Sequence, residues 1–191
     1  MSVGRILAAA LVGGIVMFAW GAIEHEATPL GLMGLSTLPH DEPLLSQIRD
    51  AVPDDGLYFV PGIDMKKATK EELEEWQARN KKGPAGLLLI HKTGVEMTPK
   101  LLINECVSNI LAAFILALIF SRWPVSKMTA GLLGLGIGVY GWISIVFSYW
   151  NWYGFPGSFS FAALVEQAVG GFLSGIAIAL VLGRKRQPAV I

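Results

Sequence analysis

The sequence predicts an α-helical membrane protein: a bundle of four membrane-spanning helices with a small extracytoplasmic α/β subdomain inserted between the first two. Hydrophobic residues make up 53% of the 191 residues, and the mean hydropathy is +0.53. Four apolar runs are long enough to cross a bilayer core of about 30 Å, which takes about 20 helical residues. A long polar segment separates the first run from the other three. The runs are Ile6–Ile23, Leu101–Phe120, Met128–Trp150 and Phe161–Leu182.

The basic residues near the ends of these runs predict how the helices are oriented. Lys and Arg close to helix ends favour the cytoplasmic side of a membrane. Such residues lie before the first run, between the second and third runs, and after the fourth run. They are Arg5, Arg122, Lys127, Arg184, Lys185 and Arg186. We therefore expect cytoplasmic N- and C-termini and an extracytoplasmic segment 24–100. The predicted parts are helix 1 in residues 1–23, the subdomain in residues 24–100, and helices 2–4 with a basic tail in residues 101–191.

The first run has a second interpretation as a cleaved signal peptide. Arg5 precedes its apolar core, and Ala19-Trp20-Gly21 resembles a cleavage site with small residues. The core is longer than that of most signal peptides, and Trp20 is typical of an anchor at the membrane interface. These two features favour a retained helix.

The polar segment between the first two runs predicts the order helix, strand, helix, strand. Pro43–Ala51 suits a short helix, and Leu57–Val60 is a short apolar run typical of a buried strand. Thr69 followed by Glu72 matches a capping box at the start of a second helix. Ala85–His91 then supplies the second strand.

Small residues spaced four apart predict close helix packing. Gly134 and Gly138 form such a pair in the third run, and Gly171 and Gly175 form one in the fourth. Pairs of this kind let helix backbones approach closely inside a membrane. They indicate either packing within the bundle or docking onto another membrane protein, and the sequence does not separate the two.

Polar residues within the runs predict a polar pocket at the outer end of the bundle. The residues are Asn104, Glu105, Asn109, Glu166 and Gln167, and ionisable groups in spanning helices often mark functional sites. The stretch Ser148–Phe159, SYWNWYGFPGSF, is expected to form an external turn that roofs this pocket. Its pocket candidates are Trp150, Asn151, Trp152 and Tyr153, although aromatic residues also anchor helices at the interface.

Two short acidic segments that contain histidines suggest a metal site. The segments are Glu24-His25-Glu26 and His40-Asp41-Glu42, and their two imidazoles and four carboxylates are ligand types for divalent metals. The spacing matches no established metal signature, and adjacent residues diverge on a helix. We therefore expect one or two of residues 24–26, at most, to share a site with His40. Interfacial polar residues and a helix cap are the alternative.

Several function classes lack their sequence signals. There is no phosphate-binding loop, dinucleotide fingerprint, zinc-protease motif or nucleophile elbow. No basic surface with interleaved aromatic residues points to nucleic acid. The single cysteine, Cys106, excludes an intrachain disulfide.

Four segments resemble an uncharacterised family of small bacterial inner-membrane proteins with four spans. The segments are FAWGAIEH, LYFVPG, WQARNKKGPAGLL and SYWNWYGFP before the last run. The resemblance covers nearly the whole chain and is most specific in SYWNWYGFP. It implies a bacterial inner-membrane location and a four-span topology, but it supplies no activity, cofactor or catalytic residue.

The leading hypothesis is a non-catalytic accessory or assembly subunit of a larger membrane complex. Its expected partners are the lipid bilayer and either other membrane-protein subunits or further copies of the chain. The first alternative is binding or transport of a small solute, ion or lipid at the outer membrane interface, through Glu105, Asn109 and Glu166. The second is a metal-dependent envelope enzyme that uses His25 and His40. The sequence does not identify a cofactor.

Overall fold

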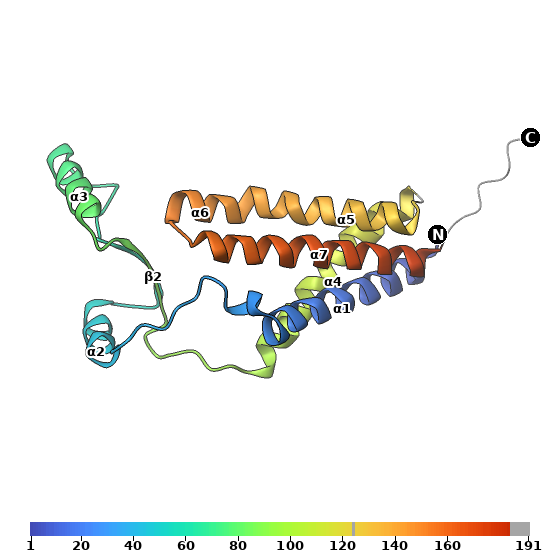
Figure 1. The fold of residues 1–191 in the computed structure, drawn as a ribbon, viewed down its shortest axis with the longest axis horizontal. Coiled ribbons are helices and arrows are strands. Elements are labelled where there is room, and N and C mark those ends of the chain that lie inside the picture. Colours follow the sequence, from blue (N-terminus) through green and yellow to red (C-terminus); the bar gives the residue numbers. More distant parts are fainter. Residues whose placement is uncertain (124, 184–191) are drawn as a thin grey trace, which may run out of the picture. The chain divides into compact units, whose positions relative to one another are not determined.

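The protein consists of two compact units. A computed structural model describes residues 1–123 and 125–183 (Figure 1). The first unit comprises Met1–Leu35 and Met97–Ile191, and the second comprises Ser36–Glu96. The predicted basic tail, Arg184, Lys185 and Arg186, lies outside the described residues.

The first unit is built from long apolar helices that contain the four predicted runs. The helices are α1 (Val3–Ala27), α4 (Pro99–Arg122), α5 (Lys127–Gly141) with its continuation to Tyr153, and α7 (Gly157–Leu182). Within the described residues, four helical stretches are long and apolar enough to cross a membrane, which confirms that part of the prediction. Helix α1 continues beyond Ile23 to Ala27, so its last turn carries polar side chains.

The third run is not a uniform α-helix. After α5 the chain forms a π-helical turn, η2 (Trp142–Val146), and then α6 (Phe147–Tyr153). The expectation that the whole aromatic string forms a turn is therefore wrong, because its first half is helical. Only residues 154–156 connect α6 to α7. Gly154 ends α6 with a φ of 71°, a left-handed conformation that glycine adopts at little cost.

The paired glycines pack α5 against α7. Gly134 faces the carbonyl group of Gly171, and Gly138 faces that of Gln167. Gly175 in turn faces the carbonyl group of Ala130. A Cβ at any of these glycines would collide with backbone atoms, which cannot rotate away. The small residues thus serve packing inside the bundle.

Helix α1 packs on both α4 and α7. Gly14 lies against the backbone of Ile110, and Gly13 lies against the side chain of Ile178. Toward the N-terminus of α1 these contacts continue into a dry core, which also includes Ala9, Ala113, Ala117 and Phe120. The Arg5 side chain donates a hydrogen bond from Nε to the carbonyl oxygen of Val181 at 2.9 Å. A cation is favourable there because the C-terminal end of a helix carries partial negative charge.

The second unit contains two short helices and a two-stranded antiparallel sheet. Its elements are α2 (Glu42–Ala51), β1 (Gly56–Val60), α3 (Lys70–Lys82) and β2 (Gly86–Ile90). Tyr58 lies opposite Leu88 in the sheet. Both hydrogen bonds of the predicted capping box are formed between Thr69 and Glu72. The indole of Trp76 holds α3 to the end of β1 by donating to the Pro61 carbonyl at 2.8 Å.

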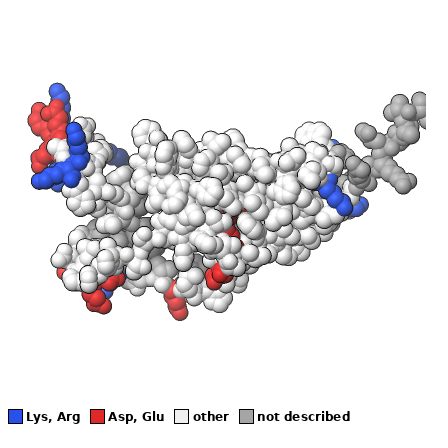
Figure 2. All heavy atoms as spheres, viewed as in Figure 1, with Lys and Arg blue, Asp and Glu red and all other residues white. Residues whose placement is uncertain are grey.

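Charged side chains are distributed unevenly over the surface. On the face in Figure 2, the long helices expose a surface that is almost free of Lys, Arg, Asp and Glu, whereas α3 carries both signs. An uncharged helical surface is typical of contact with lipid, where an uncompensated charge is costly. The acidic groups at one end of the long helices form the site described next.

Candidate functional site

The helical unit contains a hollow of about 810 Å³ with walls from α1, α4 and α7. Part of the wall is apolar and includes Met17, Phe18, Trp20 and Leu102. The polar part consists of His25, Glu26, Glu105, Asn109, Glu166 and Gln167. Among the residues that the structure describes, no Lys or Arg lines this hollow. The hollow is therefore an acidic pocket with partly apolar walls.

Chain direction brings the polar groups of this pocket together. Glu26 lies near the C-terminal end of α1, whereas Glu105 and Glu166 lie in the first half of α4 and α7. Asn109 Nδ2 donates a hydrogen bond to Glu105 Oε1 at 3.3 Å, as expected for neighbours one helical turn apart. The predicted polar residues Glu105, Asn109, Glu166 and Gln167 thus lie around one hollow.

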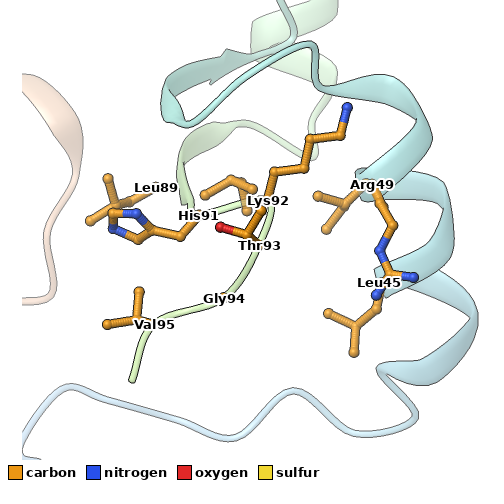
Figure 3. A pocket seen from close by; sticks show the side chains of 10 residues that line it. Leu45, Arg49, Leu89, His91, Lys92, Thr93, Gly94 and Val95 are labelled. Carbon is orange, nitrogen blue, oxygen red and sulfur yellow. The ribbon is translucent and has the colours of Figure 1, made fainter. Parts of the chain in front are cut away.

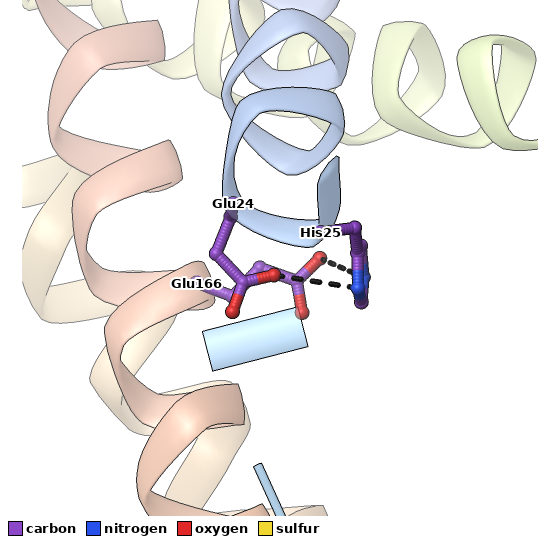
Figure 4. Close-up of side chains that lie close together, drawn as sticks. All are labelled: Glu24, His25 and Glu166. Carbon is purple, nitrogen blue, oxygen red and sulfur yellow. Dashed lines mark ion pairs between the residues drawn. The ribbon is translucent and has the colours of Figure 1, made fainter. Parts of the chain in front are cut away.

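Three side chains beside this pocket form a tighter group, the Glu24–His25–Glu166 cluster (Figure 4). His25 Nδ1 lies 3.5 Å from Glu24 Oε2, and His25 Nε2 lies 3.8 Å from Glu166 Oε1. One ligand atom from each residue falls within 4.8 Å of the others. The imidazole therefore lies beside two carboxylates that come from different helices.

The two carboxylates of the cluster differ in their exposure. Glu24 is only 1% exposed, whereas the side chains of Glu166 and His25 are 39% and 56% exposed. Glu24 Oε2 is buried and has no hydrogen-bond partner among the described residues. Leaving an ionised carboxylate buried without compensation costs several kcal/mol. The cluster therefore has an unmet requirement for a positive charge or a hydrogen-bond donor.

The chain after α1 holds the first two cluster residues in place. Thr28 Oγ1 donates to the carbonyl of Glu24 at 2.7 Å and accepts from the Leu30 amide at 3.1 Å. The following 3₁₀ turn, η1 (Pro29–Leu32), brings Gly31 directly against the backbone of His25. A side chain at position 31 would collide with that backbone. The end of α1 is therefore fixed by both a hydrogen-bonded cap and a glycine contact.

Glycine also makes room for the third cluster residue. A Cβ on Gly21 would lie 3.6 Å from Glu166 Oε1, so the carboxylate rests over the bare backbone of α1. Trp20, the residue before it, has a buried Nε1 without a hydrogen-bond partner among the described residues. Trp20 Nε1, a donor, and Glu24 Oε2, an acceptor, thus both lie unsatisfied on the same stretch of α1.

The predicted aromatic roof is not part of this pocket wall. Trp150, Asn151, Trp152 and Tyr153 lie on α6, and none of them is among the described residues that line the hollow. Tyr149 instead contacts Tyr153 in a tilted arrangement, with ring centroids 6.0 Å apart. Further ring contacts run from Tyr149 to Phe155 and from Phe155 to Phe159. The aromatic residues pack among themselves.

Two other predicted residues also lie outside the pocket. Asn104 is an exposed residue of α4 and does not line the hollow. His40 belongs to the second unit, whereas the Glu24–His25–Glu166 cluster lies entirely in the first. The prediction that adjacent residues 24–26 diverge is wrong for Glu24 and His25, which converge with Glu166, and Glu26 lines the same hollow as His25.

The second unit has a separate open groove of about 520 Å³. Figure 3 shows its wall, to which α2 contributes Leu45 and Arg49 and the chain after β2 contributes Lys92 and Val95. Lys92 Nζ donates to the carbonyls of Val52 and Pro53 at 2.9 and 3.2 Å. The amine is therefore used for local structure.

The carboxylate of Asp55 binds the chain at the end of β2. Asp55 accepts a hydrogen bond from the Lys92 amide at 2.8 Å, and its other oxygen lies 3.4 Å from His91 Nδ1. The backbone hydrogen bond from Lys92 lowers the pKa of Asp55 below 3.8, with a smaller contribution from His91. His91 thus has the structural role of joining the two strand ends.

The sequence analysis named all three members of the cluster, Glu24 and His25 as metal ligands and Glu166 as a pocket residue, but it did not place them together. Polar residues at the outer ends of apolar runs indicated that they would meet at one end of a bundle. The pairing of Glu24 with Glu166 depends on the rotation of α1 against α7. That rotation follows from contacts such as Gly13 with Ile178, which a single sequence does not specify.

No family model, curated protein or solved structure matches the chain in comparisons of all three kinds. The fold alone therefore defines the class of protein. It is a mostly helical protein whose described part has four helices long and apolar enough to cross a membrane, together with a small two-stranded sheet.

Proposed function

We propose that the chain is a multi-pass membrane protein that binds a cation in the hollow among α1, α4 and α7. The observation that carries this proposal is the negative charge of the acidic side chains that line the hollow. Glu26, Glu105 and Glu166 line it, and no Lys or Arg does so among the described residues. Carboxylates in spanning helices are costly unless they are paired or face an aqueous cavity. A bound cation supplies the missing partner.

The size and the walls of the hollow suit either a bare ion or a small organic cation. Its volume of about 810 Å³ falls within the range of about 300–1,000 Å³ found for small-molecule pockets. Phe18 and Trp20 contribute to the wall. Aromatic faces attract cations through their quadrupole. The ligand class is therefore a cation, and the walls also accept an apolar substituent.

We further propose a bacterial inner membrane with both termini in the cytoplasm, as the resemblance of SYWNWYGFP and the basic flanks imply. The two ends of the helical unit carry side chains of opposite charge, which supports this orientation. Arg5 lies beside Val181 near the C-terminal end of α7, and Lys127 begins the antiparallel neighbour α5 at the same end. The acidic hollow lies toward the opposite end. It would open on the extracytoplasmic side.

Cation-induced stabilisation tests the proposed function. The full chain in lipid nanodiscs is heated with alkylammonium ions, polyamines, alkali metals or divalent metals, and the midpoint Tm is measured. A ligand that binds only the folded state raises Tm. We expect at least one cation class to do so, and Glu166→Gln to weaken its binding at least about threefold, equivalent to about 0.7 kcal/mol.

A matched control separates this effect from a general change of charge. Glu71→Gln removes a carboxylate in the first turn of α3, outside the hollow. It should leave the cation response unchanged. The proposal fails if no cation raises Tm, or if Glu166→Gln and Glu71→Gln change the response equally.

The accessory-subunit hypothesis remains a prediction without support from the paired glycines. Those glycines motivated it, and they pack α5 against α7 within the chain. Copurification from native membranes in mild detergent tests it. A stoichiometric partner would support the hypothesis, and a monodisperse particle of this chain alone would contradict it.

A further inference from the structure

The Glu24–His25–Glu166 cluster offers one imidazole nitrogen and two carboxylate oxygens to a single point. The ligand atoms lie within 4.8 Å of one another, and Figure 4 shows His25 beside both carboxylates. Two protein segments far apart in the sequence, the end of α1 and the first half of α7, supply them. Convergence of this kind distinguishes the cluster from acidic side chains scattered over a surface.

Glu24 gives an independent reason to place a ligand at this point. Its Oε2 is buried, lacks a hydrogen-bond partner among the described residues and lies 3.5 Å from His25 Nδ1. That distance is too long for a good hydrogen bond. A helix end that is capped by Thr28 and packed against Gly31 presents this oxygen in a fixed position. The buried oxygen is therefore preorganised and unsatisfied.

We propose that Glu24, His25 and Glu166 bind a divalent transition metal such as Zn²⁺ or Mn²⁺. This inference rests on the proposed cation-binding function and names the cation and its ligands. One imidazole with two carboxylates suits Zn²⁺, and the carboxylates also suit Mn²⁺, whereas Mg²⁺ and Ca²⁺ prefer all-oxygen ligand sets and Cu⁺ prefers sulfur. Three protein ligands leave a coordination position for water or a solute from the hollow.

The spacing of the cluster is compatible with such a site. Zinc bonds of about 2.1 Å in a tetrahedral site hold two ligand atoms about 3.4 Å apart. His25 Nδ1 lies 3.5 Å from Glu24 Oε2, close to this spacing, whereas the distance of 3.8 Å to Glu166 Oε1 is measured from the other ring nitrogen, Nε2. One ligand atom from each of the three residues lies within 4.8 Å of the others. The ligand atoms therefore have to draw closer to share one metal, and the partly exposed Glu166 is the carboxylate with room to do so.

Metal binding to the full chain in nanodiscs tests the assignment. The protein is treated with a chelator, exchanged into metal-free buffer and titrated separately with Zn²⁺ and Mn²⁺ by calorimetry, and bound metal is counted by elemental analysis. We expect one metal ion per chain for at least one of the two metals. Glu24→Gln, His25→Ala and Glu166→Gln should each weaken binding at least about tenfold, since even outer-shell changes cost 10–100-fold.

Two substitutions serve as matched controls. His91→Ala removes a histidine of the second unit, where it pairs with Asp55, and Glu71→Gln removes a carboxylate in the first turn of α3, outside the hollow. Metal affinity should change less than about threefold in either control, because neither side chain is a proposed ligand. Binding of Co²⁺ to the wild type gives a second readout, since its visible absorption reports ligand type and coordination number.

The possible results separate this inference from the proposed function. If organic cations raise Tm through Glu105 and Glu166 while no metal binds, the metal site is wrong and cation binding survives. If metal binds but Glu24→Gln and His25→Ala retain full affinity, the ligand assignment is wrong. If neither metal nor any other cation binds, both proposals fail, and the cluster is an ion pair between His25 and the two carboxylates.

Discussion

The two sides of α7 differ in how closely they let a neighbouring helix approach. On the α5 side, Gly171 and Gly175 face backbone carbonyls, and the two helices touch along their main chains. On the α1 side, Glu166 rests over Gly21, and a hollow of about 810 Å³ opens among α1, α4 and α7. One helix therefore combines a closed interface with a candidate site. Small residues close the first side, and polar and apolar side chains together line the hollow on the second.

The closed side should be the more sensitive to added volume. Gly171→Leu places a Cβ against the carbonyl of Gly134, which has no free rotation to escape. We expect it to destabilise the bundle by about 3 kcal/mol, near the upper end of overpacking costs. Thermal unfolding of the full chain in nanodiscs measures the effect.

Gly136→Leu is the matched control for this prediction. It lies on α5, and a Cβ there has no heavy atom within 4 Å. The same substitution should change stability by less than about 0.5 kcal/mol, as exposed positions usually do. Equal destabilisation by the two variants would contradict the assignment of Gly171 to a closed interface.

On the α1 side of α7, added volume should cost little stability but should weaken cation binding in the hollow. A Cβ on Gly21 lies at an ordinary contact distance of 3.6 Å from Glu166 Oε1. Gly21→Leu should therefore cost less than about 1 kcal/mol, since Leu also favours a helix over Gly. The longer side chain fills space beside Glu166, so the cation-induced rise in Tm should fall by half or more. A variant that retained the full response would show that the ligand does not occupy this part of the hollow.

Asp55 in the second unit is an exposed carboxylate whose hydrogen bonds are formed, unlike those of the buried Glu24 Oε2. The pKa of Asp55 is lowered chiefly by the Lys92 amide, so its contact stabilises the fold above pH 3.8. That contribution is lost as the pH falls through the still lower pKa of the folded state, because protonation then removes the charge-assisted hydrogen bond. Its exposure makes this the smallest of the expected effects.

Hydrogen exchange at the Lys92 amide measures this effect in the full chain. Asp55→Asn should speed exchange above pH 3.8, and the difference from the wild type, compared at each pH, should shrink at lower pH. Asp54→Asn, one residue earlier, is the control and should leave the Lys92 amide protected. Equal protection in the wild type and Asp55→Asn at neutral pH would contradict the role of this carboxylate.

Local patterns predicted the positions of the helices and strands well, but the expectation that Leu57–Val60 is buried is wrong, because Leu57 and Phe59 are exposed on one face of the two-stranded sheet. The four apolar runs fall inside long helices, because about 20 consecutive apolar residues have few other stable arrangements. The capping box at Thr69 and Glu72 formed as expected, since both partners lie within one turn. The aromatic string was misread because Pro156 and Gly157 suggested a longer turn. Helical spacing within it, such as Tyr149 with Tyr153, continued the helix instead.

The amino-acid sequence alone indicates which segments are apolar helices, which residues are small enough for close packing, and that the polar side chains gather toward one end. These properties depend on composition and on spacing along one helix. Only the tertiary structure decided that Gly171 meets Gly134, that Glu24 and His25 converge with Glu166, and that the aromatic residues leave the hollow unroofed. The physical reason is that such contacts depend on the rotation and separation of whole helices. Side chains distant in the sequence set both quantities together.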